Sequence, residues 1–205
     1  KKANKKNFLN NYNATFIHLS SHGFSDYTEV NDTSLSLISA GILLAGYNDW
    51  CYGSKKDNFD NGLITAQEIS FLSMEQLDLV VLSACESGWA NSDGLNLYKG
   101  LSWAFLYAGA KSCINSLFEV DEALTTIFMM IFYDYLKKYP VAKALHETKL
   151  KCMNLTLDEI KSNYIFRYVL VKNKEYYNKE YHVEYPFCES PIIYSFICTF
   201  KNTKM

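Results

Sequence analysis

The sequence LDLVVLSACESG, from Leu77 to Gly88, contains the feature that decides the predicted fold. Its first half holds an apolar run, Leu79 to Leu82, which is too short for a globular helix and contains two β-branched valines. Such a run is typical of a strand that is buried on both faces of a parallel sheet. The run stops on small residues, with Cys85 at the turn. We therefore predict a central strand that carries a cysteine just past its carboxyl end.

A second stretch has the same layout. The predicted strand Phe16 to Leu19 leads into Ser20, Ser21, His22 and Gly23. In open α/β sheets, ligands bind in the crevice outside the carboxyl ends of the strands. A histidine and a cysteine that each follow a buried strand would open into one such crevice. This pairing of His22 with Cys85 is the main sequence feature that points to a function.

Length and charge limit the classes of protein to consider. The 205 residues suit one domain with a substantial core, and 49% hydrophobic with 20% charged residues is an ordinary globular balance. The net charge of −2 gives no bulk attraction to nucleic acid or to an anionic membrane. We expect no direct nucleic-acid binding and no membrane association, since no apolar run reaches the ~18 residues of a membrane span. The lysines near the start of the chain are interpreted as a solvated tail.

The cysteines indicate a compartment. Six are present, without a C-x-x-C pair or any spacing typical of metal ligands. We therefore expect free thiols in a reducing cytoplasm, no metal ion and no cofactor. The chain begins with Lys1 rather than methionine, which suggests a piece of a longer protein.

The pattern along the chain predicts alternating strands and helices. Thr65 and Glu68 match a capping box, Gly109 closes one helix and Asp121 begins another. Residues 1–14 are expected to form a disordered or linker tail, and 15–205 one domain, in which 155–187 is an atypical Tyr-rich insertion without a clear period. Polar loops are expected at 24–34, 52–62 and 89–99. The expected strands are 15–21, 36–45 (or a hairpin arm), 79–82, 111–117 and 191–200, and the expected helices are 66–72, 101–108, 122–138 and 141–153.

This alternation favours a three-layer α/β/α domain with a largely parallel sheet. Within it, His22 and Cys85 suit nucleophilic catalysis. A thiol attacks carbonyls as the thiolate, and a neutral histidine can take its proton and return it to the leaving amine. The amides of Gly23 and Cys85 are placed to hold a developing oxyanion. The alternative is that Cys85 is a small buried side chain and His22 a hydrogen-bonded loop residue. His18, on the side of its strand opposite to Leu19, is interpreted as a packing residue.

Several motifs in order, among them HLSSHG, LDLVVLSACESG and SLFEVDEALTT, resemble the CHAT domain, a caspase-like family of clan CD often joined to tetratricopeptide repeats. The resemblance runs from about Thr15 to Met153, and PIIYSF is similar to the last strand of the family. It implies that His22 is the general base, that Cys85 is the nucleophile, and that the Gly23 and Cys85 amides form the oxyanion hole. Family members have further strands before the histidine, so we expect N-terminal strands to be missing from this chain.

The resemblance also implies a partner. An upstream repeat domain or an effector complex is the expected activator, since some CHAT proteases are switched on by RNA-guided or nucleotide-signalled bacterial defence complexes. One alternative is a non-catalytic caspase-like scaffold or interaction module. A glutamine amidotransferase or α/β-hydrolase is disfavoured, because Ser83 takes the place of the first glycine of G-x-C-x-G and the histidine comes first in the chain.

The substrate pocket is expected to be acidic. The loops that follow His22 and the strand 111–117 offer carboxylates and contain no lysine or arginine. A buried carboxylate favours a cationic P1 residue, because an unpaired desolvated anion is costly. Separases, which are similar around SLFEVDE, bind arginine with acidic residues there. The alternative for Asp121 is that it only caps the following helix. The residues assigned to this S1 pocket are Asp26, Ser83, Glu119, Asp121 and Glu122.

Overall fold

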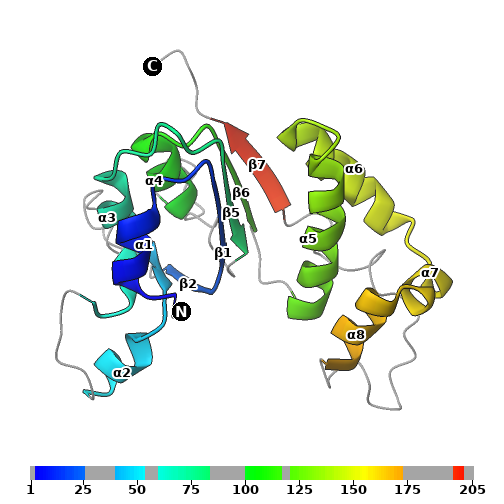
Figure 1. Cartoon of the computed structure of the whole chain (residues 1–205), viewed down its shortest axis with the longest axis horizontal. Coiled ribbons are helices and arrows are strands. Elements are labelled where there is room, and N and C mark those ends of the chain that lie inside the picture. The colour runs from blue at the N-terminus through cyan, green and yellow to red at the C-terminus, as the bar shows by residue number, and fades with distance from the viewer. Residues whose placement is uncertain are drawn as a thin grey trace. The chain divides into compact units, whose positions relative to one another are not determined.

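A computed structural model of the chain describes residues 3–25, 40–53, 60–83, 100–116, 121–172 and 196–200 (Figure 1). The chain divides into two compact units. The sheet unit consists of Lys1–Glu119 with Ile197–Met205, and the helical unit consists of Val120–Phe196. Strands alternate with helices as the sequence predicts, and the mixed α/β fold with a parallel sheet is confirmed. It is consistent with a caspase-like architecture.

Sheet A belongs to the sheet unit and contains its parallel strand pairs. Its strands are β1 (Phe16–Ser20), β5 (Leu79–Ser83), β6 (Ser112–Ser116) and β7 (Phe196–Phe200), and their order is β1-β5-β6-β7. β5 pairs in parallel with β1 on one side and with β6 on the other. The predicted central strand is therefore confirmed. The residues 191–195, expected to begin the last strand, lie outside the described part of the chain.

Sheet B is antiparallel. Its strands are β2 (His22–Ser25), β3 (Ala40–Leu43) and β4 (Leu63–Thr65), in the order β2-β3-β4. β3 confirms the strand or hairpin arm expected at 36–45, of which 36–39 lie outside the described residues, whereas β2 and β4 were not predicted. The sequence suggested a loop from Phe24 onward, whereas Phe24 and Ser25 belong to β2. Gly41 makes this pairing fit, because a Cβ atom there would lie 2.5 Å from the Phe24 ring and 2.6 Å from the Ile64 carbonyl oxygen.

Four helices belong to the sheet unit: α1 (Lys5–Asn11), α2 (Tyr47–Cys51), α3 (Ala66–Ser70) and α4 (Leu101–Ala108). α3 begins at the predicted capping box. α4 ends at Gly109, whose φ of 123° suits glycine. A Cβ atom there would also lie 2.8 Å from the backbone nitrogen of Glu75.

The expectation of little order in residues 1–14 is wrong for 5–11, which form α1. The Asn4 side chain caps the helix by accepting a hydrogen bond from the Asn7 amide. Lys5 is only 5% exposed, and its ammonium group binds Glu68 on α3. A contact between residues so far apart in the chain cannot be read from a polar N-terminal composition.

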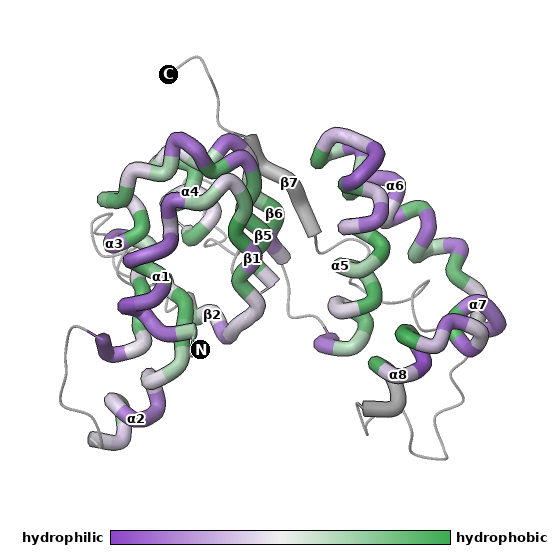
Figure 2. Tube along the Cα trace, viewed as in Figure 1, coloured by the Kyte–Doolittle hydropathy of each residue, from purple (hydrophilic) through white to green (hydrophobic). Residues whose placement is uncertain are grey.

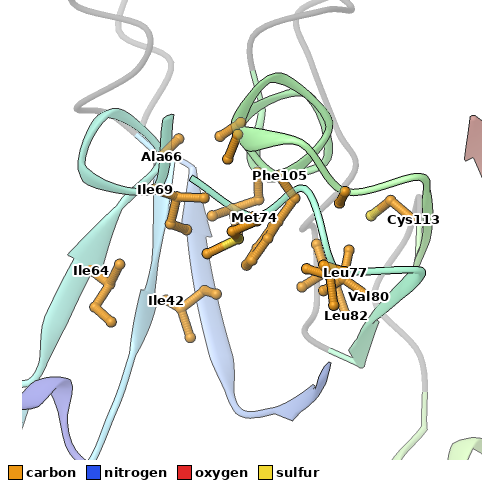
Figure 3. Packing of buried hydrophobic residues seen from close by; sticks show 14 of the residues in the cluster. Ile42, Ile64, Ala66, Ile69, Met74, Leu77, Val80, Leu82, Phe105 and Cys113 are labelled. Carbon is orange, nitrogen blue, oxygen red and sulfur yellow. The ribbon is translucent and has the colours of Figure 1, made fainter. Parts of the chain in front are cut away.

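The core of the sheet unit packs residues of both sheets, among them Ile42 of β3 and Ile64 of β4, against the helices α3 and α4 (Figure 3). Val80 and Leu82 of β5 belong to this core, and Ile17 and Leu19 of β1 pack against it. Val81 faces the other way and is also fully buried. The trace of β5 and β6 is largely hydrophobic, whereas much of the trace of α1 is hydrophilic (Figure 2). β5 is therefore buried on both of its faces, as its unbroken apolar run predicts.

The helical unit contains α5 (Glu122–Leu136), α6 (Val141–Met153), α7 (Leu157–Ser162) and α8 (Tyr164–Lys172). α5 and α6 confirm the two helices predicted there, and they pack against each other. α7 and α8 lie in the stretch 155–187, where the sequence shows no clear period. In the described ranges, no helix is long and apolar enough to cross a membrane.

Candidate active site

His22 stands where the chain passes from one sheet to the other. It follows β1 by two residues and is the first residue of β2, where it pairs with Leu43 of β3. The hydroxyl of the intervening Ser21 donates a hydrogen bond to the Leu43 carbonyl. Leu43 thus ties both Ser21 and His22 to β3. His22 is exposed, so its imidazole is open to an incoming substrate.

Cys85 lies outside the described residues, and Ser83 is the last described residue of β5. The register of sheet A is described as far as the strand ends that lead to the two segments. Ser20 of β1 is directly paired with Ser83 of β5. His22 follows Ser20 by two residues, and Cys85 follows Ser83 by two residues. The residues that precede His22 and Cys85 by two positions therefore stand at one pair of neighbouring strand ends.

Gly23, the first predicted contributor to the oxyanion hole, is the second residue of β2 and pairs with Ile42. The second contributor, the Cys85 amide, falls outside the described residues. Both assignments stay predictions. Gly23 continues the strand begun by His22, so any shift of β2 moves the histidine and the glycine amide together.

A histidine–serine pair lies next to these strand ends. The Nε2 atom of His18 is 3.0 Å from the Oγ atom of Ser83, within hydrogen-bond distance. His18 faces away from Leu19 as predicted, but its ring bonds to a neighbouring strand instead of serving only for packing. Desolvation of the ring lowers the pKa of His18 below its ordinary value. The imidazole is therefore neutral at pH 7, although the residue as a whole is exposed.

The residues assigned to the S1 pocket fall into three groups. Asp26 and Glu119 lie outside the described residues. Ser83 is in the sheet unit, where its hydroxyl meets His18. Asp121 and Glu122 begin α5 in the helical unit: the Asp121 carboxylate accepts a hydrogen bond of 2.8 Å from the Leu124 amide, and Glu122 is exposed in the first turn. The capping role named as the alternative for Asp121 is therefore present.

Sequence reasoning missed a buried polar group on β6. Asn115 is 1% exposed and pairs with Leu82, yet its Oδ1 atom has no hydrogen-bond partner. An unpaired buried acceptor costs about 1–3 kcal/mol and calls for an explanation. The sequence contains a signal for this group, because Asn115 is a polar residue in the middle of KSCINSL, which is predicted to be a strand. Its neighbour Ser116 is also fully buried.

A separate hollow of about 510 Å³ lies in the helical unit, and none of the predicted site residues lines it. It is bordered by Ile131, Asp134, Tyr135, Lys138, Lys151, Leu155, Glu159, Ser162, Asn163 and Phe166. Charges of both signs line it, and two of them, Lys151 and Glu159, neutralise each other in an ion pair. Among the described residues, no group of three or more His, Cys, Asp or Glu side chains is arranged to hold a metal ion.

Comparison with known families agrees with this geometry. The family model of the CHAT domain matches residues 1–185. The chain therefore belongs to the CHAT domain family, which is related to the caspase-like cysteine peptidases. The match confirms the resemblance carried by the sequence motifs. No curated protein matches the chain.

Proposed function

We propose that this CHAT domain is a cysteine endopeptidase in which Cys85 is the nucleophile and His22 is the general base. The observation that carries the proposal is the register of sheet A. Ser20 pairs with Ser83, and His22 and Cys85 each follow at the same distance along the chain. A nucleophile and a base at adjacent strand ends are the arrangement that acyl transfer requires.

The residues divide the chemistry between them. His22, as the general base, takes the proton from the Cys85 thiol, and the thiolate attacks the carbonyl carbon of the scissile peptide. The amides of Gly23 and Cys85 donate hydrogen bonds to the oxyanion. His22 then gives its proton to the leaving amine, which departs as an acyl-enzyme remains. A water molecule, deprotonated by His22, attacks this thioester, and its collapse releases the carboxylic acid and restores the thiol.

Three cysteines in the described part of the chain support the choice of Cys85 by contrast. Cys113 and Cys152 are buried, and burial raises the pKa of the Cys152 thiol to about 12. A thiol with that pKa is almost never a thiolate at neutral pH and is inert as a nucleophile. Cys51 is exposed, but it lies on α2, away from the ends of the strands in sheet A.

A cationic P1 residue is the substrate class that we propose. The proposed carboxylates come from two stretches of the sequence. One stretch follows His22 and contains Asp26, and the other follows the predicted strand 111–117 and contains Glu119, Asp121 and Glu122. An arginine or lysine side chain would pair with such a carboxylate. Asp121 already caps α5 through one oxygen, and a carboxylate has a second oxygen for a ligand. In a peptide library, Asp121→Asn should weaken the preference for Arg and Lys more than Asp26→Asn. Preference for Asp at P1 would contradict this substrate class.

The third part of the proposed function is activation by a partner. The support is the likeness to CHAT peptidases that are joined to tetratricopeptide repeats and serve in bacterial defence. We propose that an upstream repeat domain or an effector complex in the cytoplasm switches the peptidase on. Addition of the neighbouring domain of the parent protein should raise the cleavage rate of this chain.

The experiment is cleavage of a peptide library by the chain and by two variants, with products identified by mass spectrometry. Cys85→Ala and His22→Ala should each reduce cleavage by about 10³-fold or more, because residues of a catalytic unit fail together. Circular dichroism should show that both variants stay folded, since His22 is exposed. Cleavage by Cys85→Ala at the wild-type rate would contradict the mechanism. Binding of a partner without cleavage under any condition would favour the scaffold alternative.

A further inference from the structure

We propose that His18 and Ser83 are positioning residues that fix the ends of β1 and β5 relative to each other and so set the geometry of His22 and Cys85. The inference rests on the proposed function for its catalytic consequence. It begins from the hydrogen bond between the His18 Nε2 and Ser83 Oγ atoms, 3.0 Å apart. His18 was assigned to packing, and Ser83 to a substrate pocket.

The direction of the bond along the sheet is informative. His18 is paired with Val81 in the register of sheet A, and Ser83 lies two residues further along β5. The imidazole therefore reaches diagonally, toward the carboxyl ends of the strands. His18 and Ser83 lie on the face of the sheet opposite to Ile17 and Leu82, which face the core. The bond is thus an addition to a ladder that the core already holds in place.

The pair joins the two catalytic segments at their bases. Ser83 precedes Cys85 by two residues, and His18 precedes His22 by four. β1 ends at Ser20 and the chain then turns into sheet B, so the backbone pairing with β5 stops before His22. A cross-strand bond beside this end limits how far the two segments can slide or splay. Acyl transfer is sensitive to such motion, since a displacement of about 1 Å can cost about 10²-fold in rate.

The chemistry of the pair suits this role. A neutral imidazole can accept the Ser83 hydroxyl proton or donate its own, so the contact persists with either tautomer. The Ser83 hydroxyl donates to or accepts from the His18 ring, whereas His22 is the histidine that the proposed function assigns to the reaction. Each partner therefore acts through the other, and a double-mutant cycle reports that dependence.

The test measures alkylation of Cys85 by a peptidyl acyloxymethyl ketone, followed by mass spectrometry, in His18→Ala, Ser83→Ala and the double variant. Each single variant should slow labelling by about 10- to 100-fold, and the double variant should be no slower than the singles. His18→Gln and Ser83→Thr keep a hydrogen-bonding group and should recover most of the rate. His146→Ala, the same substitution at an exposed position of α6, is the control and should leave the rate unchanged.

Three results would overturn the inference: wild-type labelling in both single variants, rate losses that multiply in the double variant, or a fluorophosphonate adduct on Ser83 that requires His18. The last result would make the pair a serine–histidine dyad. If wild-type Cys85 is not labelled at all, the proposed function fails, and backbone amide signals then decide this inference separately. Ser83→Ala should shift the amide signal of His22 across the strand pair, and an unchanged signal contradicts the positioning role.

Discussion

Each unit contains a Thr-x-x-Glu capping box at the start of a short helix, and we call each of these turns a corner. In the sheet unit, the Thr65 hydroxyl accepts a hydrogen bond of 3.2 Å from the Glu68 amide, and the Glu68 carboxylate accepts one of 3.0 Å from the Thr65 amide. In the helical unit, Thr156 and Glu159 make the same two bonds with the same two lengths. Each corner begins a short helix, α3 or α7.

A lysine binds the glutamate of each corner, and here the two differ. Lys5, from α1, reaches Glu68 with its side chain only 7% exposed. Lys151, from α6, reaches Glu159 with its side chain 37% exposed. A buried ammonium group depends on its partner far more than one that water can solvate. The same local pattern therefore has a structural role in one unit and a smaller one in the other.

Removal of the two glutamates should separate the corners most clearly. Glu68→Ala leaves the buried Lys5 ammonium unpaired and should lower the free energy of unfolding by about 3–5 kcal/mol. Glu159→Ala leaves a lysine that water reaches, so its loss should be clearly smaller. Urea titration followed by circular dichroism measures both. Glu68→Gln, which keeps a cap but not the charge, is the control and should fall between. Equal losses at the two corners would show that burial of Lys5 has no consequence.

Substitution of the two threonines should lower the free energy of unfolding by similar amounts at the two corners. Thr65→Ala and Thr156→Ala each delete one capping hydroxyl and should each cost about 1 kcal/mol. The matched variants Thr65→Ser and Thr156→Ser keep the hydroxyl and should cost little. The same urea titration applies. A much larger loss at Thr65 alone would mean that this cap, and not only the ion pair, is coupled to the sheet unit.

The two corners also show which local patterns can be recognised from the sequence. Both contain T-x-x-E, but only Thr65 was identified as a cap, because the apolar residues of α3 follow it in a regular pattern, whereas 155–187 is dominated by Tyr, Lys and Glu. A capping box is defined by four residues and does not need a periodic helix after it. The second capping box, and with it the start of α7, could therefore have been predicted from the sequence.

Other features of the fold could not be predicted from the sequence. The helix α1 depends on the contact of Lys5 with Glu68, and β2 depends on the space that Gly41 leaves for Phe24. Both are contacts between segments that are distant in the chain. The strand ends that carry His22 and Cys85 were predicted from local runs, because buried strands have an apolar pattern of their own. The bond between His18 and Ser83 required the register of β1 against β5, which no local pattern contains.

Acid titration should give the smallest effect, and it tests the corner of the helical unit. The hydrogen bond from Lys151, followed by the bond from the Thr156 amide, lowers the pKa of Glu159 below its ordinary value. A carboxylate with a lowered folded-state pKa adds stability above its unfolded-state pKa, and this is lost as the pH falls through the folded value. The α7 corner should therefore stay intact at pH 5 and loosen as the pH falls further. The Glu159 carboxyl signal in an NMR titration measures this, and Lys151→Ala should move its midpoint upward. A midpoint at the ordinary value in the unaltered chain contradicts the assigned cause.

The most direct measurement for the site is the rate at which a peptidyl acyloxymethyl ketone alkylates each cysteine, in the wild-type chain and in His22→Ala. Exposed Cys51 is the internal reference thiol. The dyad predicts that Cys85 reacts first and that His22→Ala slows it by about 10²-fold or more, while the rate at Cys51 stays the same. Equal rates at Cys85 with and without His22, or reaction at Cys51 ahead of Cys85, would contradict the His22/Cys85 dyad.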